Sequence, residues 1–523
     1  METINNPILR GFNPDPSILR VGEDYYIATS TFEWWPGVQL HHSKDLVNWE
    51  QLPSPLTRLS QLNMIGNIDS GGVWAPCLSY SDGLYYLIYT DVKSRLGAYK
   101  DTHNYMVTAE DIRGPWSEPI YLNSSGFDPS LFHDEDGRKW LLNMLWDYRK
   151  GKNPFAGIVI QEYSPEEKRL IGPVKNIFKG TDLRLTEGPH VYKKNGYYYL
   201  LTAEGGTGYE HAVTMARSTS LHGPYEVDPV NPILTSHGKD HLSLQKAGHG
   251  SLVETQTGEW YLAHLCGRPV KDDRCILGRE TAIQKCYWTE DDWIRVEGEG
   301  SPQDVVPAPS LPEVTAVQES DEDDFQSKEL KLYWSSLRQP FSEDWVSLNE
   351  RKGYLRLKGG ESLLSTSRQS IVARRLDTFH AEISTIVEFE PEHFQQLGGL
   401  LFYYDIQDHV YLHISHDEEL GKILSIIHTK HQKHDEPLSR PIPLPADTPV
   451  HLQGVLEREW LQFSYSLDGN TWTNVGERID ISHLSDDSAD DIRFTGTFVG
   501  MCCQDLSGTK HPCDFSSFRY VRR

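Results

Sequence analysis

Three carboxylates stand at related positions in widely separated parts of this chain of 523 residues. Asp15 and Asp128 each directly precede a proline, and Glu187 lies two residues before another. A pair of carboxyl groups can cleave a glycosidic bond when one donates a proton to the leaving oxygen and the other activates water or attacks the sugar. Because acids that share one cleft raise one another's pKa, a purely structural role rarely brings three of them together.

A repeated sequence pattern relates these acids to one another. Each copy joins a small or turn-forming start and an aliphatic pair to a polar turn and an aromatic-rich strand. The five copies pair residues 15–19 with 25–27, 75–79 with 85–87, 128–132 with 140–142, 188–192 with 198–200, and 249–253 with 260–262. They recur every 53 to 61 residues, which fits one four-stranded blade. Residues 1–300 are therefore predicted to form a five-bladed β-propeller.

The innermost strands of a propeller line a central channel. Since the acids start equivalent inner strands, Asp15, Asp128 and Glu187 are expected to converge there, with Trp74 and Phe127 as apolar walls. For Asp15 or Asp128 taken singly, capping of a turn before proline is the simpler interpretation. For the set we favour catalysis on a sugar, because Glu187 has no such turn role and aromatic residues accompany the acids.

The composition changes beyond the fifth copy. Residues 301–324 are rich in proline and acids and are expected to form a linker over the propeller, with the acidic run 321–324 in solvent. Alternating apolar and polar residues then predict strands, and Asp468-Gly469 predicts a tight turn. Residues 325–523 are therefore expected to form a β-sandwich that closes the site, so the expected fold class is all-β.

The charge of the chain excludes several classes of partner. With 75 acidic and 50 basic residues, its net charge is −25 at pH 7, so nucleic acid and anionic membrane surfaces are not expected to bind. The first residues resemble no signal peptide and no apolar run could span a bilayer, so we expect a cytoplasmic protein. Seven cysteines without a disulfide pattern are expected to be buried free thiols.

Four motifs resemble those of glycoside hydrolase family 43, and more closely those of its two-domain β-xylosidases. They lie at residues 13–17, 127–130, 186–190 and 277–281, and the resemblance extends over both domains in the same order. It implies a five-bladed propeller followed by a concanavalin-like jelly roll. It also implies that Asp15 is the general base, Glu187 the general acid, and Asp128 the residue that orients Glu187 and raises its pKa. Such enzymes invert the anomeric centre, which requires roughly 6.5–9.5 Å between base and acid.

The resemblance also assigns substrate-binding residues. Arg279 would bind sugar hydroxyls and help to keep Asp15 ionised; a surface ion pair is the alternative. His249 would support the base or bind water or a cation, although a satisfied buried histidine is nearly as good an interpretation. No cofactor is expected to be required, and a structural calcium near His249 is conceivable by analogy. The sequence itself shows no oxygen cage for one.

Two phenylalanines complete the predicted pocket. Phe32 matches an aromatic wall residue of the family, with packing of its blade as the alternative. Phe515 is the candidate for a phenylalanine that the second domain places over the pocket, against ordinary core packing. With that cover the pocket is blind, so only a chain end could enter and the enzyme would be exo-acting.

The expected function is an exo-acting, inverting β-D-xylosidase that releases xylose from the non-reducing ends of xylo-oligosaccharides, with α-L-arabinofuranosidase activity in addition. One alternative is an α-L-arabinofuranosidase acting on arabinan or arabinoxylan side chains through an open groove. Another is a non-catalytic carbohydrate-binding protein, which the presence of all three acids disfavours. The family resemblance also suggests a homo-oligomer.

Overall fold

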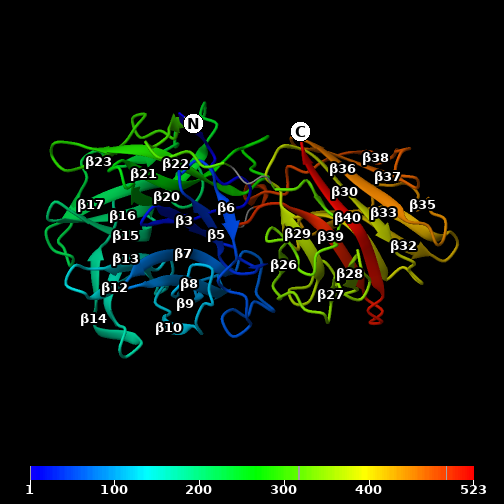
Figure 1. The fold of residues 1–523 in the computed structure, drawn as a ribbon, viewed down its shortest axis with the longest axis horizontal. Helices are drawn as coiled ribbons and strands as arrows, with labels where there is room; N and C mark the ends of the chain where they lie inside the picture. Colours follow the sequence, from blue (N-terminus) through cyan, green and yellow to red (C-terminus); the bar gives the residue numbers. More distant parts are fainter. Residues whose placement is uncertain (1, 316–318, 490–491) are drawn as a thin grey trace.

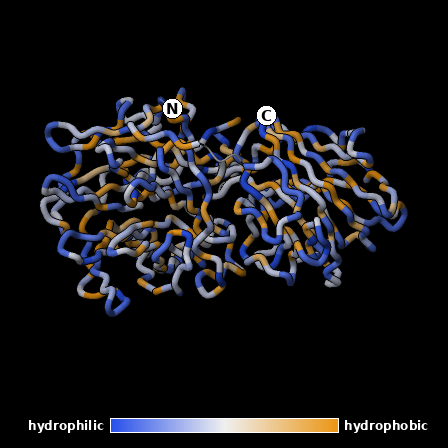
Figure 2. The backbone as a smooth tube through the Cα atoms, viewed as in Figure 1, coloured by the Kyte–Doolittle hydropathy of each residue, from blue (hydrophilic) through white to orange (hydrophobic). Residues whose placement is uncertain are grey.

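The computed structural model describes residues 2–315, 319–489 and 492–523. Figure 1 shows two β-rich bodies side by side, with the N-terminal part in blue to green and the C-terminal part in yellow to red. Apolar segments follow the strands of both bodies, and many outer loops are hydrophilic (Figure 2). No helix in the described ranges is long and apolar enough to cross a membrane. All seven cysteines are buried and free, as predicted.

The first body consists of five antiparallel sheets, four with four strands and one with a short fifth strand, which confirms the predicted propeller. The first blade contains β2 (Ser17–Val21), β3 (Asp24–Thr29), β5 (Gln39–Ser43) and β6 (Glu50–Leu52). The second contains β7 (Gly72–Ser81), β8 (Leu84–Ser94), β9 (Asp101–Ala109) and β10 (Ile120–Asn123). The third contains β11 (Ser130–His133), β12 (Lys139–Trp146), β13 (Phe155–Ser164) and β14 (Arg169–Phe178). The fourth contains β15 (Glu187–Lys194), β16 (Tyr197–Glu204), β17 (Ala212–Ser218) and β18 (Glu226–Val227), with β19 (Leu234–Thr235) beside β17. The fifth contains β20 (Gln245–Glu254), β21 (Trp260–Gly267), β22 (Arg279–Trp288) and β23 (Ile294–Val296).

Tight turns build the hairpins of these blades. Between β7 and β8, Asp82 and Gly83 have φ of 55° and 80°, and between β15 and β16, Asn195 and Gly196 have φ of 50° and 81°. Paired left-handed residues match the twist of the flanking strands, which explains the Asp-Gly and Asn-Gly signals in the sequence. The innermost strands β2, β7, β11, β15 and β20 contact one another in a closed ring. The start of each repeat therefore faces the propeller axis.

The second body is a sandwich of two antiparallel sheets, as predicted. One contains β25 (Glu322–Asp323), β27 (Val346–Ser347), β28 (Leu355–Lys358), β30 (His380–Glu388), β36 (Val450–Glu457), β37 (Trp460–Ser466), β38 (Thr473–Asp480) and β40 (Pro512–Arg522). The other contains β29 (Ser370–Arg375), β31 (Gln396–Tyr403), β32 (His409–Asp417), β33 (Gly421–Lys430), β34 (Lys433–Asp435), β35 (Ile442–Pro443) and β39 (Phe498–Asp505). A short 3₁₀ helix, η1 (Asp486–Ser488), follows β38. The inner faces of the sheets bury one large apolar core.

Two short strand pairs join distant parts of the chain. Strand β1 (Thr3–Asn5) pairs with β24 (Val305–Pro307), so the start of the chain is held by residues beyond the last blade. Strand β4 (Trp34–Trp35) of the first blade pairs with β26 (Ser336–Leu337), which lies between the sandwich strands β25 and β27 in the chain. The segment expected to be a linker therefore contributes a strand to the propeller side.

The acidic run 321–324 is not wholly solvated, contrary to the expectation. Glu322 and Asp323 form β25 and pair with β40 of the sandwich. Asp323 is buried, and its carboxylate accepts a hydrogen bond of 2.8 Å from Trp334 Nε1. A buried carboxylate needs such a partner, and the sequence could not reveal a tryptophan 11 residues away as its donor.

Candidate active site

The residues that start the inner strands share an unusual backbone conformation. The φ angles of Asp15, Asp128, Gly188 and His249, which are equivalent positions of four repeats, are 55°, 54°, 56° and 49°. Left-handed backbone is uncommon for residues other than glycine, and a residue before proline normally has extended backbone. Four blades therefore share this left-handed conformation at the propeller axis, and at the three non-glycine residues it is a strained outlier of the kind that clusters at functional sites.

A cavity of about 270 Å³ lies at this point. All three predicted acids border it, together with Phe32, Trp74, Phe127, Arg279 and His249. The remaining lining residues are Ala75, Lys100, Trp146, Phe155, Leu185, Gly206, Thr207, Ile492 and Phe494. Drug-sized ligands occupy pockets of about 300–1,000 Å³, so this cavity suits a small polar ligand beside apolar walls.

Asp15 is held in its ionised form. Its Oδ1 lies 3.2 Å from Arg279 Nη1 and 3.8 Å from His249 Nδ1, and its Oδ2 accepts a hydrogen bond of 2.6 Å from Ser30 Oγ. Burial raises the pKa of Asp15, but Arg279, His249 and the Ser30 hydroxyl outweigh burial, so the pKa lies below its usual value. A buried carboxylate that stays ionised is suited to accept a proton.

The pKa values of Glu187 and Asp128 are shifted upward, opposite to that of Asp15. Burial and the charges of Asp128 and Asp15 raise the pKa of Glu187 well above its usual value. Burial and the charge of Asp15 likewise raise the pKa of Asp128, although the Gly188 N–H donates to its Oδ2 at 3.1 Å. The Glu187 carboxyl accepts no hydrogen bond from the residues that the structure describes. The cavity thus holds one ionised acid and two that tend to keep a proton.

Gly188 lets Glu187 begin β15 close to a histidine. A Cβ added at Gly188 would lie 3.0 Å from Cε1 of the His249 ring, and its φ of 56° already favours glycine. Burial lowers the pKa of His249, while the neighbouring Asp15 charge raises it. The described residues contain no cluster of three His, Cys, Asp or Glu side chains able to hold a metal, and the calcium ion near His249 stays a prediction from the family resemblance.

Arg279, the first residue of β22, connects the two bodies of the molecule. Its Nη1 donates to Asp15 and, at 2.8 Å, to Thr207 Oγ1. Its Nη2 donates at 3.0 Å to the backbone carbonyl of Phe494 in the sandwich. Its Nε lies 3.9 Å from Asp486 and has no hydrogen-bond partner among the described residues. The guanidinium group of Arg279 thus contacts the ionised Asp15, borders the cavity and binds the backbone of the second body.

Aromatic side chains form the apolar side of the cavity. The Trp74 ring contacts Phe127 edge-on at 5.0 Å between centroids, and its Nε1 donates to the Ser70 carbonyl at 2.9 Å. The Phe494 ring stacks on Phe32 at 5.7 Å and meets Trp74 edge-on at 5.4 Å. Flat apolar faces beside acids are the surroundings that a sugar ring requires.

Phe515 does not lie at the cavity, which corrects the expectation from the sequence. It belongs to β40, is fully buried in the sandwich core, and pairs across the sheet with Leu355. The alternation of β40 turns this side chain toward the opposite sheet rather than toward the propeller. The sandwich phenylalanine that borders the cavity is Phe494, in the segment between η1 and β39.

Several residues of the site were missed by reasoning from the sequence. The most important are Ser30, Thr207 and Phe494, because each hydrogen-bonds Asp15 or Arg279. The glycine-rich run at 205–208 signals a turn, but nothing in it shows that Thr207 faces the cavity. Ser30 and Phe494 lie outside the repeated positions, so the repeat alignment gives no signal for either.

Comparison with known proteins agrees with this geometry. Residues 4–294 match the model "Glycosyl hydrolases family 43", and residues 322–521 match "Beta xylosidase C-terminal Concanavalin A-like domain". A β-xylosidase of Bacillus subtilis (strain 168) is 54% identical over 99% of this chain and 100% of its own length. Xylosidase/arabinosidase 43B of Humicola insolens is 50% identical over 99% of this chain and 98% of its own.

A solved structure extends the likeness to three dimensions. The crystal structure of xylan β-1,4-xylosidase from Bacillus halodurans C-125 shares 63% of its sequence with this chain. It superposes with a TM-score of 0.98 and covers 99% of this chain and 100% of its own. The likeness extends over both bodies, including the sandwich segment that borders the cavity. The chain therefore belongs to glycoside hydrolase family 43 and is a glycoside hydrolase.

Proposed function

We propose that the protein is an exo-acting β-D-xylosidase that releases xylose from the non-reducing ends of xylo-oligosaccharides with inversion. The observation that carries the proposal is the opposed pKa of two acids on one small cavity: that of Asp15 is lowered and that of Glu187 is raised. The names of the relatives, which are β-xylosidases or xylosidase/arabinosidases, support xylose as the released sugar.

The proposed reaction is a single displacement. Asp15 takes a proton from a water molecule as the water oxygen attacks the anomeric carbon. Glu187 gives its proton to the glycosidic oxygen, and the bond between that oxygen and the anomeric carbon breaks. Asp15 ends protonated and Glu187 ionised, so one proton returns through solvent before the next turnover. Asp128 accepts a hydrogen bond from the Gly188 N–H, and its closeness to Glu187 raises the pKa of Glu187.

The exo mode is supported by the position of the sandwich. Ile492 and Phe494 border the cavity from the second body, and the three acids border it from the propeller. A groove open at both ends would accept internal units of a chain, whereas a cavity covered on one side admits a chain end. We propose that the sandwich closes the site in this way and that the domains comprise residues 1–300, 301–324 and 325–523.

A second activity on α-L-arabinofuranosides is proposed beside the first. The two sugars present similar hydroxyl groups to a compact pocket, and the Humicola relative carries both activities in its name. The alternative in which arabinan or arabinoxylan side chains are the main substrates predicts a higher kcat/KM on arabinofuranosides than on xylobiose.

An NMR time course of xylobiose hydrolysis tests these proposals. Early release of α-xylose would support β-xylosidase activity with inversion. Early β-xylose would mean retention, and Asp15 would then have to act as a nucleophile. Hydrolysis of arabinofuranosides alone would move the assignment to the alternative, and binding without hydrolysis of either would support a carbohydrate-binding protein.

Location and assembly remain predictions from the sequence. We propose a cytoplasmic protein that forms a homo-oligomer and binds neither nucleic acid nor membranes. Cell fractionation and light scattering of the purified protein would test both.

A further inference from the structure

One residue of the sandwich makes contact with most of the site. The Phe494 carbonyl accepts from Arg279 Nη2, its N–H donates at 3.1 Å to Ser70 Oγ, and its ring contacts Phe32 and Trp74. Arg279 in turn holds Asp15. A shift of this backbone would therefore change an aromatic wall and the charge environment of the proposed base together.

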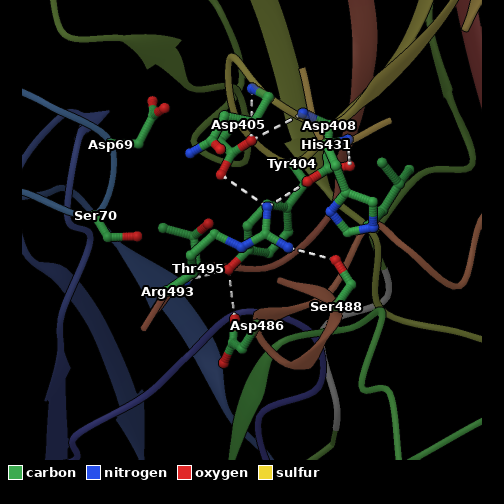
Figure 3. Close-up of polar contacts among 12 residues, drawn as sticks. Asp69, Ser70, Tyr404, Asp405, Asp408, His431, Asp486, Ser488, Arg493 and Thr495 are labelled. Atoms are coloured by element: carbon green, nitrogen blue, oxygen red, sulfur yellow. Dashed lines mark hydrogen bonds and ion pairs between the residues drawn. The ribbon is translucent and has the colours of Figure 1, made fainter. Parts of the chain in front are cut away.

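The residue before Phe494 is anchored deep in the sandwich (Figure 3). The Arg493 side chain is fully buried; its Nη1 pairs with Asp405 Oδ2 at 3.1 Å and with Asp408 Oδ2. Its Nη2 donates to the Ser485 carbonyl at 2.7 Å and to Ser488 Oγ. Each partner lies either in the turn between β31 and β32 or around η1. Arg493 thus fixes the position of the backbone directly before Phe494.

The residue after Phe494 is held by the same anchor. Thr495 N–H donates to Tyr404 Oη at 3.2 Å, and the Arg493 guanidinium carbon lies 4.6 Å from the centre of the Tyr404 ring. Tyr404 Oη also donates to Asp486 at 2.6 Å. Both neighbours of Phe494 are therefore fixed by buried polar contacts within the sandwich.

Ser70 fixes Phe494 from the propeller. Ser70 is buried and has a left-handed φ of 57°. All three of its polar groups are used: its N–H donates to Glu33 Oε2 at 3.0 Å, its carbonyl accepts from Trp74 Nε1, and its hydroxyl oxygen accepts from Phe494 N–H. One serine thus connects an aromatic wall of the propeller to the wall that comes from the sandwich.

We propose that Ser70 and Arg493 are positioning residues of the active site, which act through Phe494 on Arg279 and so on Asp15. The inference rests on the proposed function only for its kinetic readout. Neither residue borders the cavity, so neither touches substrate. If Phe494 is displaced, Arg279 loses a backbone acceptor, and the guanidinium that keeps the pKa of Asp15 low becomes less constrained.

The test uses the full chain and compares four variants. Ser70→Ala removes only the hydroxyl, and Ser70→Gly does the same while relieving the left-handed backbone. Arg493→Lys keeps the charge but loses the planar fork. Arg356→Lys is the matched control, because Arg356 pairs with Asp514 at 2.8 Å within the sandwich and does not border the cavity.

Three quantities are measured for each variant: kcat/KM on an aryl xyloside, its acid-side pH limb, and amide exchange of the peptide containing Phe494. Loss of one hydrogen bond predicts a fall of about tenfold in kcat/KM for the Ser70 variants and Arg493→Lys. Their acid limb should move to higher pH because Asp15 is less well stabilised as an anion, and the Phe494 amide should exchange faster. Arg356→Lys should change none of the three.

Failure of this inference can be distinguished from failure of the proposed function. If folded Ser70 and Arg493 variants keep the wild-type pH limb and exchange rate, the inference is overturned, whatever their melting temperature. If the wild-type protein hydrolyses no glycoside, the proposed function fails, and the exchange measurement still decides whether Ser70 and Arg493 hold Phe494. A double variant, Ser70→Ala with Arg493→Lys, should lose less than the product of the single losses, because both act on one backbone segment.

Discussion

Arg279 and Arg493 are both buried arginines that pair with aspartates, but their surroundings differ. Arg493 pairs with two carboxylates, whose other oxygens accept backbone N–H groups from Gln407 and Asp408 or from His431. Arg279 pairs closely with Asp15 alone and borders a cavity that also holds Glu187, whose carboxyl has no hydrogen-bond partner among the described residues. The charged groups around Arg493 pair with one another, whereas those around Arg279 border the cavity.

This difference separates a structural cluster from a reactive one. Buried charges that are paired with one another rigidify a structure, although burial and the charge of Asp69 raise the pKa of Asp405 to about 7 even in the Arg493 cluster. Around Arg279 the shifts go in opposite directions, which gives an acid and a base in one site. The sandwich thus contributes rigidity and the propeller contributes chemistry.

The largest effect is expected from removing one carboxylate of each cluster. Asp15→Asn should lower kcat by roughly 10⁴-fold, because general base catalysis contributes up to about that factor. Asp408→Asn should instead destabilise the fold while lowering kcat/KM of the folded protein no more than about tenfold, the loss of one hydrogen bond. Steady-state kinetics and thermal melting of both variants check this. Equal losses of activity would remove the distinction between the clusters.

The next effect concerns the proposed acid. Glu187→Gln should lower kcat/KM by roughly 10²–10⁴-fold on xylobiose, whose leaving group must be protonated, and far less on an aryl xyloside with an acidic phenol. A series of aryl xylosides of graded phenol pKa measures this dependence. The same loss on every leaving group would show that Glu187 does not donate the proton.

A smaller loss is expected at the wall that the sandwich supplies. Phe494→Ala removes two aromatic contacts, each of which contributes about 0.5–1.5 kcal/mol, so kcat/KM should fall about tenfold or somewhat more. Phe515→Ala is the matched control: it opens the sandwich core and should cost stability of about 3–5 kcal/mol without changing kcat/KM of the folded fraction. Kinetics at a temperature where both variants are folded separate the two.

The smallest effect is a change in stability with pH. Because the folded-state pKa of Glu187 is raised above its unfolded value, its ionisation opposes folding, and stability falls as pH rises above the unfolded pKa. A rise of one pKa unit on folding lowers the free energy of unfolding at high pH by about 1.4 kcal/mol. Glu187→Gln should therefore melt a few degrees higher than wild type at pH 8, with the difference vanishing near pH 4. Melting curves across this range check it, and a lower melting temperature at pH 8 would contradict a buried, protonated acid.

The features that repeat were predictable from the sequence. Five copies with regular spacing predict five blades, and their alignment brings Asp15, Asp128 and Glu187 to one axis. This worked because equivalent positions in a repeat adopt equivalent backbone, seen here in the shared left-handed φ of Asp15 and Asp128. The walls Trp74 and Phe127 followed from the same alignment.

Contacts between the two bodies were not predictable in the same way. Phe494 lies in an irregular segment after η1, where no periodicity shows which side chain faces the propeller. Phe515 is aromatic and lies near the end of the chain, but strand alternation directs it into the core. The choice between the two depends on how one body rests on the other. Ser70 was missed for the same reason, since its role arises only from the approach of a second domain.

The two short strand pairs between distant parts of the chain determine how the molecule can be divided. A fragment that ends at residue 300 would lose β24, the partner of β1, and also β26, the partner of β4. It would thereby expose two strand edges and the apolar side chains of Trp34 and Trp35, which are features that promote aggregation. For protein engineering, the catalytic body is therefore not an exchangeable module. Grafting the propeller onto another partner would require residues up to about 340 to travel with it.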